Sequence, residues 1–196
     1  MDTDVLIPLK RLDTAKSRLR SALSGAERRQ LMGGMVAHVV RTAVAAGAGR
    51  VAIASSDPGA PALAAALGVA CVSDGGLAWN AGLGHARGLL ASGAGAVLYL
   101  AGDLPLLEPT DVAALVAAGA RATAVIGRAH DGGTNALWVA PADAFEPAFG
   151  SRGSAAVHAA LAVAAGLRPV VLDRPGLAHD VDTPADLAHA RRLLPV

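Results

Sequence analysis

Two aspartates that lie two positions apart give the first indication of chemistry in this chain. Asp180 and Asp182 belong to a short run that is predicted to be extended. In extended backbone, residues i and i+2 point to the same side, so both carboxylates can face one cation. A helix start follows directly, with Thr183 as N-cap, Pro184 at the first helical position and Asp186 in the first turn. The sequence therefore predicts a carboxylate pair held rigidly beside a helix.

A third carboxylate, Asp103, ends another apolar strand in the segment 101–105. Mg²⁺ prefers oxygen ligands and usually takes one or two protein carboxylates together with substrate phosphates. In phosphoryl chemistry it neutralises charge on the transferring and leaving oxygens. We therefore expect Asp103, Asp180 and Asp182 to hold divalent metal for a nucleotidyl transfer, with Mg²⁺ as the ion and Mn²⁺ as a substitute. The alternative is that Asp182 only caps the helix and Asp180 is only solvated.

The densest positive charge lies in the loop 10–18, which follows the first predicted strand and contains both lysines. The chain has no P-loop and no dinucleotide fingerprint, so side chains would have to supply the charge that binds a polyphosphate. The loop should open at the same edge of the sheet as the acids, which favours phosphate binding over an ordinary solvated loop. Lys10 and Lys16 are therefore expected to hold phosphate groups, and Arg11 and Lys16 are assigned to a nucleotide.

Two loops that contain glycine are candidates for anion binding. In the loop 131–135, two glycines allow backbone N–H groups to turn toward an anion, and Thr134 adds a hydroxyl donor. In the loop 149–154, Gly150 and Gly153 precede a helix with Ser154 as its N-cap, which predicts a phosphate cradle at the positive end of the helix dipole. An ordinary hairpin loop and a plain capped helix are the respective alternatives.

Further polar residues have weaker functional interpretations. Asp74 and Asn80 could form a base or ribose pocket in which Asn80 pairs with a purine edge, although an Asn at a helix start is often structural. Cys71 is the single cysteine, which excludes an internal disulfide, and it is interpreted as a core residue. The following histidines lack metal-ligand spacing and are interpreted as structural: His85, His130, His158 and His179.

The elements that must position these residues alternate between strand and helix. Strands are predicted at 5–9, 50–55, 69–73, 96–101, 122–127, 136–139 and 169–172. Helices are predicted at 27–46, 61–67, 77–91, 109–118, 154–165 and 184–194. This order predicts an α/β fold, a three-layer α/β/α single domain over residues 1–196 with a mostly parallel mixed sheet. Open sheets of this kind bind ligands at the carboxyl ends of their strands, where the polar segments lie.

Composition limits the classes of function. A chain of 196 residues with 53% hydrophobic and 17% charged residues suits one compact enzyme domain with a sizeable core. A formal net charge of +1 argues against a nucleic-acid coat and against a membrane-surface protein. No signal peptide is visible, and no apolar run is long enough to span a bilayer. A cytoplasmic enzyme is the expectation.

Taken in order, these segments resemble the CofC/FbiD family, the guanylyltransferases of coenzyme F420 biosynthesis. The resemblance covers nearly the whole chain and rests on the motifs at 8–12, 15–19, 79–81, 102–105, 133–134, 149–150, 153–154 and 180–187. It implies a GT-A-like nucleotidyltransferase fold related to that of the molybdenum-cofactor guanylyltransferases. It also implies transfer of GMP from GTP to the phosphate of a three-carbon acid, with release of pyrophosphate. The acid would be phosphoenolpyruvate, which we favour, 2-phospho-L-lactate or 3-phospho-D-glycerate.

The resemblance assigns roles to residues as well. Asp103, Asp180 and Asp182 would bind two Mg²⁺ ions. The acid would lie among Lys10, Thr134, Gly150, Gly153 and Ser154. The family usually has one residue fewer between Gly150 and Ser154, so the extra residue in this loop can alter the choice of acid.

Two other classes remain as alternatives. A molybdopterin or sugar-phosphate nucleotidyltransferase would share the fold, but such enzymes usually carry a glycine-rich loop where this chain has Pro8-Leu9-Lys10-Arg11. A nucleotide-binding regulatory module without turnover belongs to a different class, and release of pyrophosphate would distinguish it from the enzyme. Partners are expected to be GTP and a small phosphorylated acid. A homodimer is left open.

Overall fold

The computed structural model describes residues 3–12, 15–90, 95–120 and 123–193. Within these residues, all strands join one seven-stranded sheet in the order β3-β2-β1-β4-β6-β5-β7. The strands are β1 (Thr3–Pro8), β2 (Val51–Ala54), β3 (Ala70–Val72), β4 (Ala96–Leu100), β5 (Ala124–Arg128), β6 (Thr134–Val139) and β7 (Pro169–Leu172). Strand β6 runs antiparallel to its neighbours β4 and β5, and the other pairs are parallel. The predicted mostly parallel mixed sheet is confirmed.

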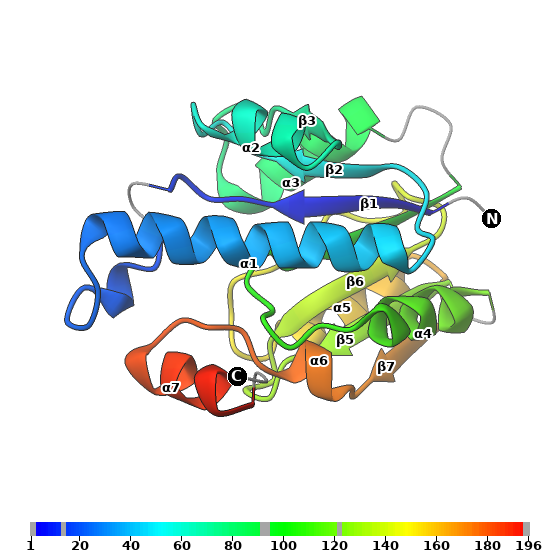
Figure 1. The fold of residues 1–196 in the computed structure, drawn as a ribbon. Helices are drawn as coiled ribbons and strands as arrows, with labels where there is room; N and C mark the ends of the chain where they lie inside the picture. Colours follow the sequence, from blue (N-terminus) through cyan, green and yellow to red (C-terminus); the bar gives the residue numbers. More distant parts are fainter. Residues whose placement is uncertain (1–2, 13–14, 91–94, 121–122, 194–196) are drawn as a thin grey trace.

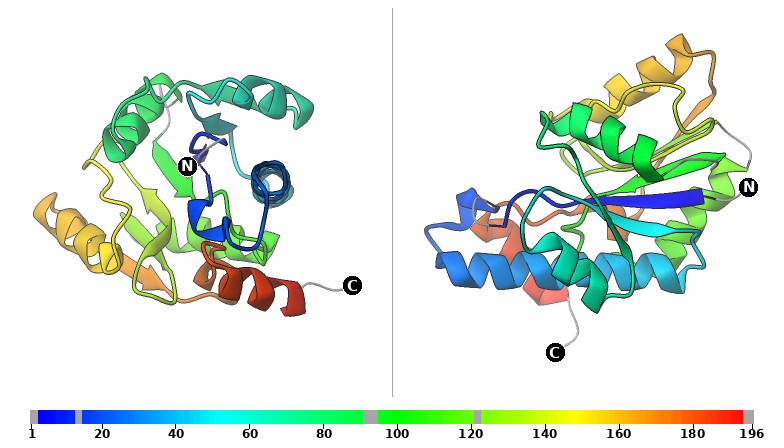
Figure 2. Two further views of the ribbon diagram at one scale, coloured as in Figure 1. Left: turned by 90° about the vertical axis from the view of Figure 1, so that its left-hand side faces the viewer. Right: turned by 90° about the horizontal axis from the view of Figure 1, so that it is seen from above.

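Helices cover both faces of this sheet. They are α1 (Gly25–Ala45), α2 (Ala60–Ala66), α3 (Trp79–Leu90), α4 (Pro109–Gly119), α5 (Ser154–Ala164), α6 (Pro175–Ala178) and α7 (Pro184–Leu193), with a 3-10 turn at Ser17–Leu19. Helix α1 runs across one face in front of β1 (Figure 1). Seen from the side, α1 and α7 lie on one side of the sheet, and α3 and α5 lie on the other (Figure 2). The predicted three-layer α/β/α arrangement is therefore confirmed.

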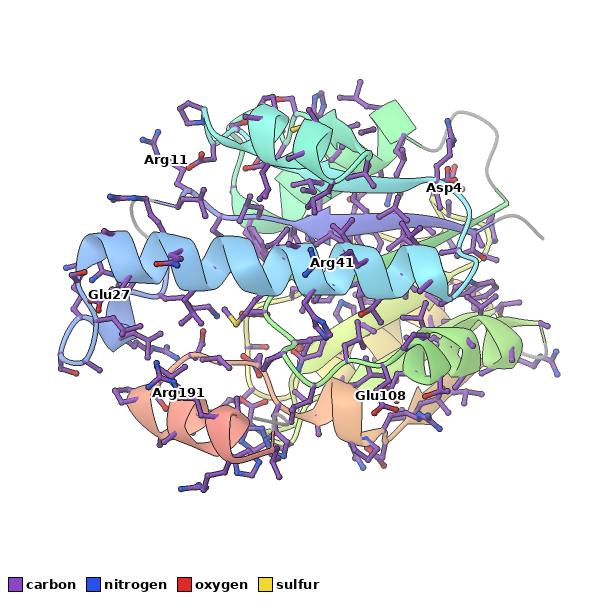
Figure 3. The ribbon with its side chains drawn as sticks, in the orientation of Figure 1. Asp4, Arg11, Glu27, Arg41, Glu108 and Arg191 are labelled. Atoms are coloured by element: carbon purple, nitrogen blue, oxygen red, sulfur yellow. The ribbon has the colours of Figure 1, made fainter. Side chains whose placement is uncertain are left out.

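Alternation along the strands explains the two layers of core. In β1, Val5 and Ile7 pack in the cluster that includes α1, whereas Leu6 packs in the cluster that includes α3. Charged side chains such as Glu27, Arg41 and Arg191 lie on the outer surfaces of their helices (Figure 3). Within the described residues, no helix is both long and apolar enough to cross a membrane.

Several predicted boundaries differ from the structure. Helix α1 begins at Gly25, because Ser24 and Glu27 form the capping box that the sequence indicates. Strand β6 begins at Thr134 rather than at 136, so Thr134 and Asn135 belong to a buried strand and not to a loop. This strand is bonded on both sides, by β4 and by β5. The predicted helix end at 91, strand start at 122 and helix end at 194 lie outside the described residues.

The order of the strands determines where a ligand can bind. From β1 the chain continues through α1 to β2 on one side, whereas β4 pairs with β1 on the other side. Open α/β sheets bind ligands in the crevice outside the carboxyl ends of the strands at such a switch point. The loop that contains Lys10 and Lys16 follows β1, and Asp103 follows β4. The fold thus places the predicted cations and one predicted acid on the two sides of this crevice.

Candidate functional site

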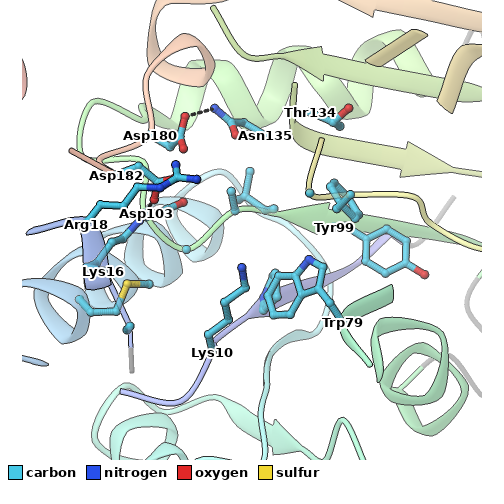
Figure 4. A pocket seen from close by; sticks show the side chains of 18 of the residues that line it. Lys10, Lys16, Arg18, Trp79, Tyr99, Asp103, Thr134, Asn135, Asp180 and Asp182 are labelled. Carbon is cyan, nitrogen blue, oxygen red and sulfur yellow. Dashed lines mark hydrogen bonds and ion pairs between the residues drawn. The ribbon is translucent and has the colours of Figure 1, made fainter. Parts of the chain in front are cut away.

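A cavity of about 390 Å³ opens at the carboxyl ends of β1 and β4 (Figure 4). Its size is within the usual range of small-molecule sites. Seven predicted site residues line it: Lys10, Lys16, Asp103, Thr134, Gly150, Asp180 and Asp182. The other predicted site residues are not among its lining: Arg11, Asp74, Asn80, Gly153 and Ser154. The structure therefore brings together the predicted acids, both lysines and part of the predicted acceptor site.

The three predicted acids form one cluster. Each of Asp103, Asp180 and Asp182 offers a carboxylate oxygen, and these oxygens lie within 4.8 Å of one another. The backbone N–H of Val181 donates to the carbonyl of Asp103 at 3.3 Å, which ties the two segments together. The carboxylate of Asp186 accepts hydrogen bonds from the backbone N–H groups of Asp182 and Thr183. These hydrogen bonds hold the segment 180–182 to Asp103 on one side and to the first turn of α7 on the other.

Lys16 lies against this cluster and is nearly buried, with 6% of its side chain exposed. Its Nζ donates to Asp103 and, at 2.9 Å, to Oδ1 of Asp182. Burial alone would lower the pKa of Lys16, but the charges of Asp103 and Asp182 outweigh it and raise that pKa. Its backbone is left-handed, with φ of 53°. Such a conformation costs a non-glycine residue about 1–3 kcal/mol, so these contacts hold a strained backbone in place.

Asp180 occupies the inner position of the cluster. Burial, followed by repulsion from Asp103, raises the pKa of its carboxyl group. Asn135 donates from Nδ2 to the Leu177 carbonyl at 2.9 Å and to Oδ1 of Asp180 at 3.4 Å. Arg18 contacts the outer acid, with Nη1 3.2 Å from Oδ2 of Asp182. The sequence prediction did not assign a role to Asn135 or Arg18, although both lie in segments that it identified.

The chemistry of this donor set fits a divalent cation. Three carboxylate oxygens are close enough to share one ion, and the Lys16 ammonium already pairs with two of these acids, Asp103 and Asp182. All-oxygen, anionic ligands are those that Mg²⁺ and Mn²⁺ prefer. Asp103, Asp180 and Asp182 could therefore hold such an ion once Lys16 moves away.

The opposite wall combines a cation with aromatic side chains. The Nζ of Lys10 lies 4.5 Å from the ring centroid of Trp79, which is a cation–π contact. Figure 4 shows Lys10 pointing into the cavity between Trp79 and the acids. Tyr99 and Phe149 also line the cavity, and their rings pack edge to face with centroids 5.9 Å apart. Such a surface can accept an anion against an apolar support.

Thr134 lies in the cavity wall and is supported from behind. Its Oγ1 is 3.1 Å from Oγ of Ser154 and 2.9 Å from Nδ1 of His158. Ser154 is 1% exposed and His158 is fully buried. Ser154 therefore reaches the cavity only through Thr134.

The prediction that Ser154 is the N-cap of α5 is wrong. Gly153, with φ of 98°, is the N-cap, and Ser154 is the first residue of the helix. The N–H groups of Gly153 and Ala155 both donate to the carbonyl of Gly132, and that of Ser154 donates to Ser151. The helix N-terminus is thus satisfied within the protein. Of the loop 149–154, Phe149 and Gly150, the latter with φ of 104°, line the cavity.

The residues predicted to bind the nucleotide are dispersed. The side-chain amide of Asn80 is fully bonded to the backbone of Phe149. Its Nδ2 donates to the Phe149 carbonyl, and its Oδ1 accepts from the Phe149 N–H. This contact opposes the predicted role of Asn80 in reading a purine. Asp74 accepts from Ser56 and from the N–H of Gly76. The nucleotide roles of Asp74 and Arg11 stay predictions.

The chain resembles known proteins in sequence and in structure. It is 40% identical to a phosphoenolpyruvate guanylyltransferase of Rubrobacter xylanophilus, over 96% of this chain and 93% of the relative. A Desulfovibrio desulfuricans G20 protein assigned to the nucleotide-diphospho-sugar transferases superposes with a TM-score of 0.79 at 21% identity, over 95% of this chain and 85% of the other. A manganese complex of a Mycobacterium tuberculosis H37Rv protein superposes with a TM-score of 0.56 at 20% identity, over 98% of both chains.

The two structural likenesses show the fold alone, because both are below 25% identity. The family described as guanylyl transferase CofC-like matches residues 3–190, which is nearly the whole sequence. The seven predicted residues that line the cavity all lie within this span. The chain therefore belongs to the CofC-like guanylyl transferase family.

Proposed function

We propose that this protein transfers GMP from GTP to the phosphate of phosphoenolpyruvate, with release of pyrophosphate, as a step of coenzyme F420 biosynthesis. The name of the Rubrobacter relative and the family membership support this reaction. The observation that carries it is the cavity itself, which places a cluster of three acids opposite a wall with Lys10 and Thr134. Both substrates are charged metabolites of the cell interior, so we place the reaction in the cytoplasm.

The acceptor needs no general base. A phosphate oxygen is already anionic near neutral pH, and it attacks the α-phosphorus of GTP directly. One P–O bond forms to the acceptor, the bond between the α- and β-phosphates breaks, and its electron pair leaves with pyrophosphate. The protein contributes position and charge neutralisation, which are the main sources of catalysis in phosphoryl transfer.

The acid cluster is the proposed metal site, with Asp103, Asp180 and Asp182 as ligands. The manganese in the Mycobacterium structure supports a divalent ion at this fold. Mg²⁺ is our proposed ion, with two ions bound and Mn²⁺ as a substitute. When bound, the metal would neutralise charge on the reacting and leaving phosphate oxygens. Lys16 and Arg18 would then exchange their contacts with the acids for contacts with the triphosphate.

We assign the opposite wall to the acid. Lys10 and the Thr134 hydroxyl would bind its phosphate and carboxylate, and Gly150 would bring the loop 149–154 close to them. Discrimination among acids must depend on the spacing between these groups. In phosphoenolpyruvate and 2-phospho-L-lactate the phosphate is on the carbon beside the carboxylate, whereas in 3-phospho-D-glycerate it is one carbon farther away.

A substrate panel tests the proposal. The purified protein is incubated with GTP or ATP and with each of the three acids, pyrophosphate release is measured, and the products are identified by mass spectrometry. We expect GTP and phosphoenolpyruvate to give the highest kcat/KM. Absence of pyrophosphate release with every pair would indicate a binding module, and a product with another acid would reassign the acceptor.

A further inference from the structure

His158 is a buried ionisable residue that the proposed mechanism does not use. It lies in α5 with 0% of its surface exposed, behind the cavity wall rather than in it. Its Nδ1 is 2.9 Å from Oγ1 of Thr134, and its Nε2 is 2.9 Å from the backbone nitrogen of Ala148. The Phe149 ring packs edge to face on it, with centroids 4.8 Å apart. Both ring nitrogens therefore have defined partners.

These partners fix the position of the proton on the ring. A backbone N–H can only donate, so Nε2 of His158 must accept from Ala148 with its lone pair. Burial lowers the pKa of His158 to about 4, and a hydrogen bond to the backbone of Ser154 opposes this only in part. The ring is consequently neutral at pH 7 and carries its single proton on Nδ1. His158 therefore donates from Nδ1, to Oγ1 of Thr134 at 2.9 Å and also to the backbone of Ser154.

The Thr134 hydroxyl can then form only one further hydrogen bond, as a donor. A hydroxyl oxygen has two lone pairs and one proton. His158 donates to one lone pair, and the Ser154 hydroxyl donates to the other at 3.1 Å. The proton of Thr134 is left over, and Thr134 lines the cavity. This side chain can therefore offer a hydrogen bond to a ligand but cannot accept one.

We infer that His158 is a positioning residue, which together with Ser154 fixes Thr134 as a hydrogen-bond donor toward an anionic oxygen of the acceptor acid. The inference rests on the proposed function, because that function assigns this wall to the acid. This role explains why His158 is buried and bonded to the Thr134 hydroxyl instead of lining the cavity. Lys10, the other polar side chain assigned to the acid, is also a pure donor. The acid thus meets only donors on this wall, which matches a ligand whose phosphate and carboxylate are acceptors.

Two variants of His158 separate the proposed role from ordinary packing. In His158→Asn, the side-chain amide nitrogen can take the place of Nδ1 and keep the donor to Thr134, while the contact with Ala148 is lost. In His158→Gln, the amide oxygen can take the place of Nε2 and keep the contact with Ala148, while the donor to Thr134 is lost. Each variant loses one hydrogen bond, so a purely structural role predicts similar effects for both.

We expect His158→Gln to raise the KM for the acid about tenfold or more, with the KM for GTP nearly unchanged. We expect His158→Asn to recover most of that loss, even if its Tm falls as far as that of His158→Gln. Equal effects on the acid KM in both variants, or no effect in either, would overturn the positioning role. Thr134→Val removes the hydroxyl but keeps the shape, and it should raise the acid KM at least as much as His158→Gln.

A measurement on the parent protein tests the proton assignment without any activity. Long-range ¹H–¹⁵N NMR correlations of the histidine rings should show His158 neutral and protonated on Nδ1 at pH 7. A proton on Nε2 would refute the inference, while guanylyl transfer could still stand. If instead the ring is protonated on Nδ1 but Thr134→Val raises the KM for GTP and not for the acid, the assignment of this wall in the proposed function is wrong, and the inference falls with it.

Discussion

Replacement of Lys16 by methionine should strengthen metal binding while it weakens catalysis. Lys16 Nζ is bonded to Asp103 and Asp182, and 20% and 45% of the side chains of these two acids are exposed. A divalent ion that binds the three acids must first break these contacts. Methionine keeps most of the length and apolar surface of the side chain but has no charge, so this competition disappears.

The structure sets the size of the effect. A hydrogen bond to a charged group contributes about 1.5–3 kcal/mol, and the bond to the half-exposed Asp182 is discounted for solvent screening. Loss of both contacts is then worth roughly 2–4 kcal/mol, which corresponds to an affinity gain between about thirtyfold and nearly a thousandfold. Turnover should fall by about a hundredfold, because the ammonium is also the proposed ligand of the triphosphate.

The assay is a titration of the nucleotide-free protein with Mn²⁺, in which binding is measured by calorimetry or from the paramagnetic resonance signal of free Mn²⁺. Lys10→Met is the matched control, since it removes the same charge from the same cavity but Lys10 lies over Trp79. Its Mn²⁺ affinity should change no more than a few-fold. If Lys16→Met binds Mn²⁺ as weakly as the parent protein, or more weakly, Lys16 does not compete for the acid cluster.

Four further predictions follow from the same geometry. Asp182→Asn should lower turnover about a hundredfold with little change in Tm, because it keeps the shape and removes one charge; near-normal turnover would exclude Asp182 from the metal site. Burial and repulsion from Asp103 raise the pKa of Asp180, so its charge destabilises the metal-free fold at pH 7, and this penalty disappears as the pH falls through that pKa. Asp180→Asn should therefore raise the metal-free Tm and abolish the gain in Tm with Mn²⁺, and an unchanged Mn²⁺ response would contradict this. Deletion of Ser151 should change the kcat/KM ratios among the three acids more than it changes GTP use, and unchanged ratios in a folded variant would show that this loop does not choose the acid. The native pKa of His158 is about 4 and its ordinary value is 6.5, so stability should be lost as the pH falls between these values, by roughly 3 kcal/mol; His158→Asn should lack this loss in pH-dependent denaturation.

Local patterns were sufficient to predict the acid cluster. The spacing of Asp180 and Asp182 and the helix start after them are properties of neighbouring residues. Asp103 could be added because the carboxyl ends of the strands meet at one edge of an open sheet. The three layers and the mostly parallel mixed sheet followed from the alternation of predicted strands and helices, and the structure confirms them, whereas the order of the strands was not predicted.

Contacts between distant segments decided the parts that could not be predicted. The N–H groups at the start of α5 looked free in the sequence, but the carbonyl of Gly132, about twenty residues earlier, accepts from two of them. Asn80 looked available for a base, but the backbone of Phe149 satisfies its amide. The contact of Lys16 with the acids depends on a left-handed residue in the loop, which no spacing rule indicates.

The charges of the cavity indicate an order of events at the site. Without ligands, three carboxylates face three cationic side chains, Lys10, Lys16 and Arg18, and two of these cations are bound to the acids. An incoming triphosphate alone would have to compete with the carboxylates for Lys16 and Arg18. A triphosphate that arrives with its divalent ion supplies the acids with a new counterion and releases both side chains. Among the residues that the structure describes, no hydrogen bond or ion pair joins Lys10 or Thr134 to the three acids, so binding of the acid does not require these acids to be released from Lys16 and Arg18. We therefore expect metal and GTP to bind cooperatively, and the acid to bind with little dependence on metal.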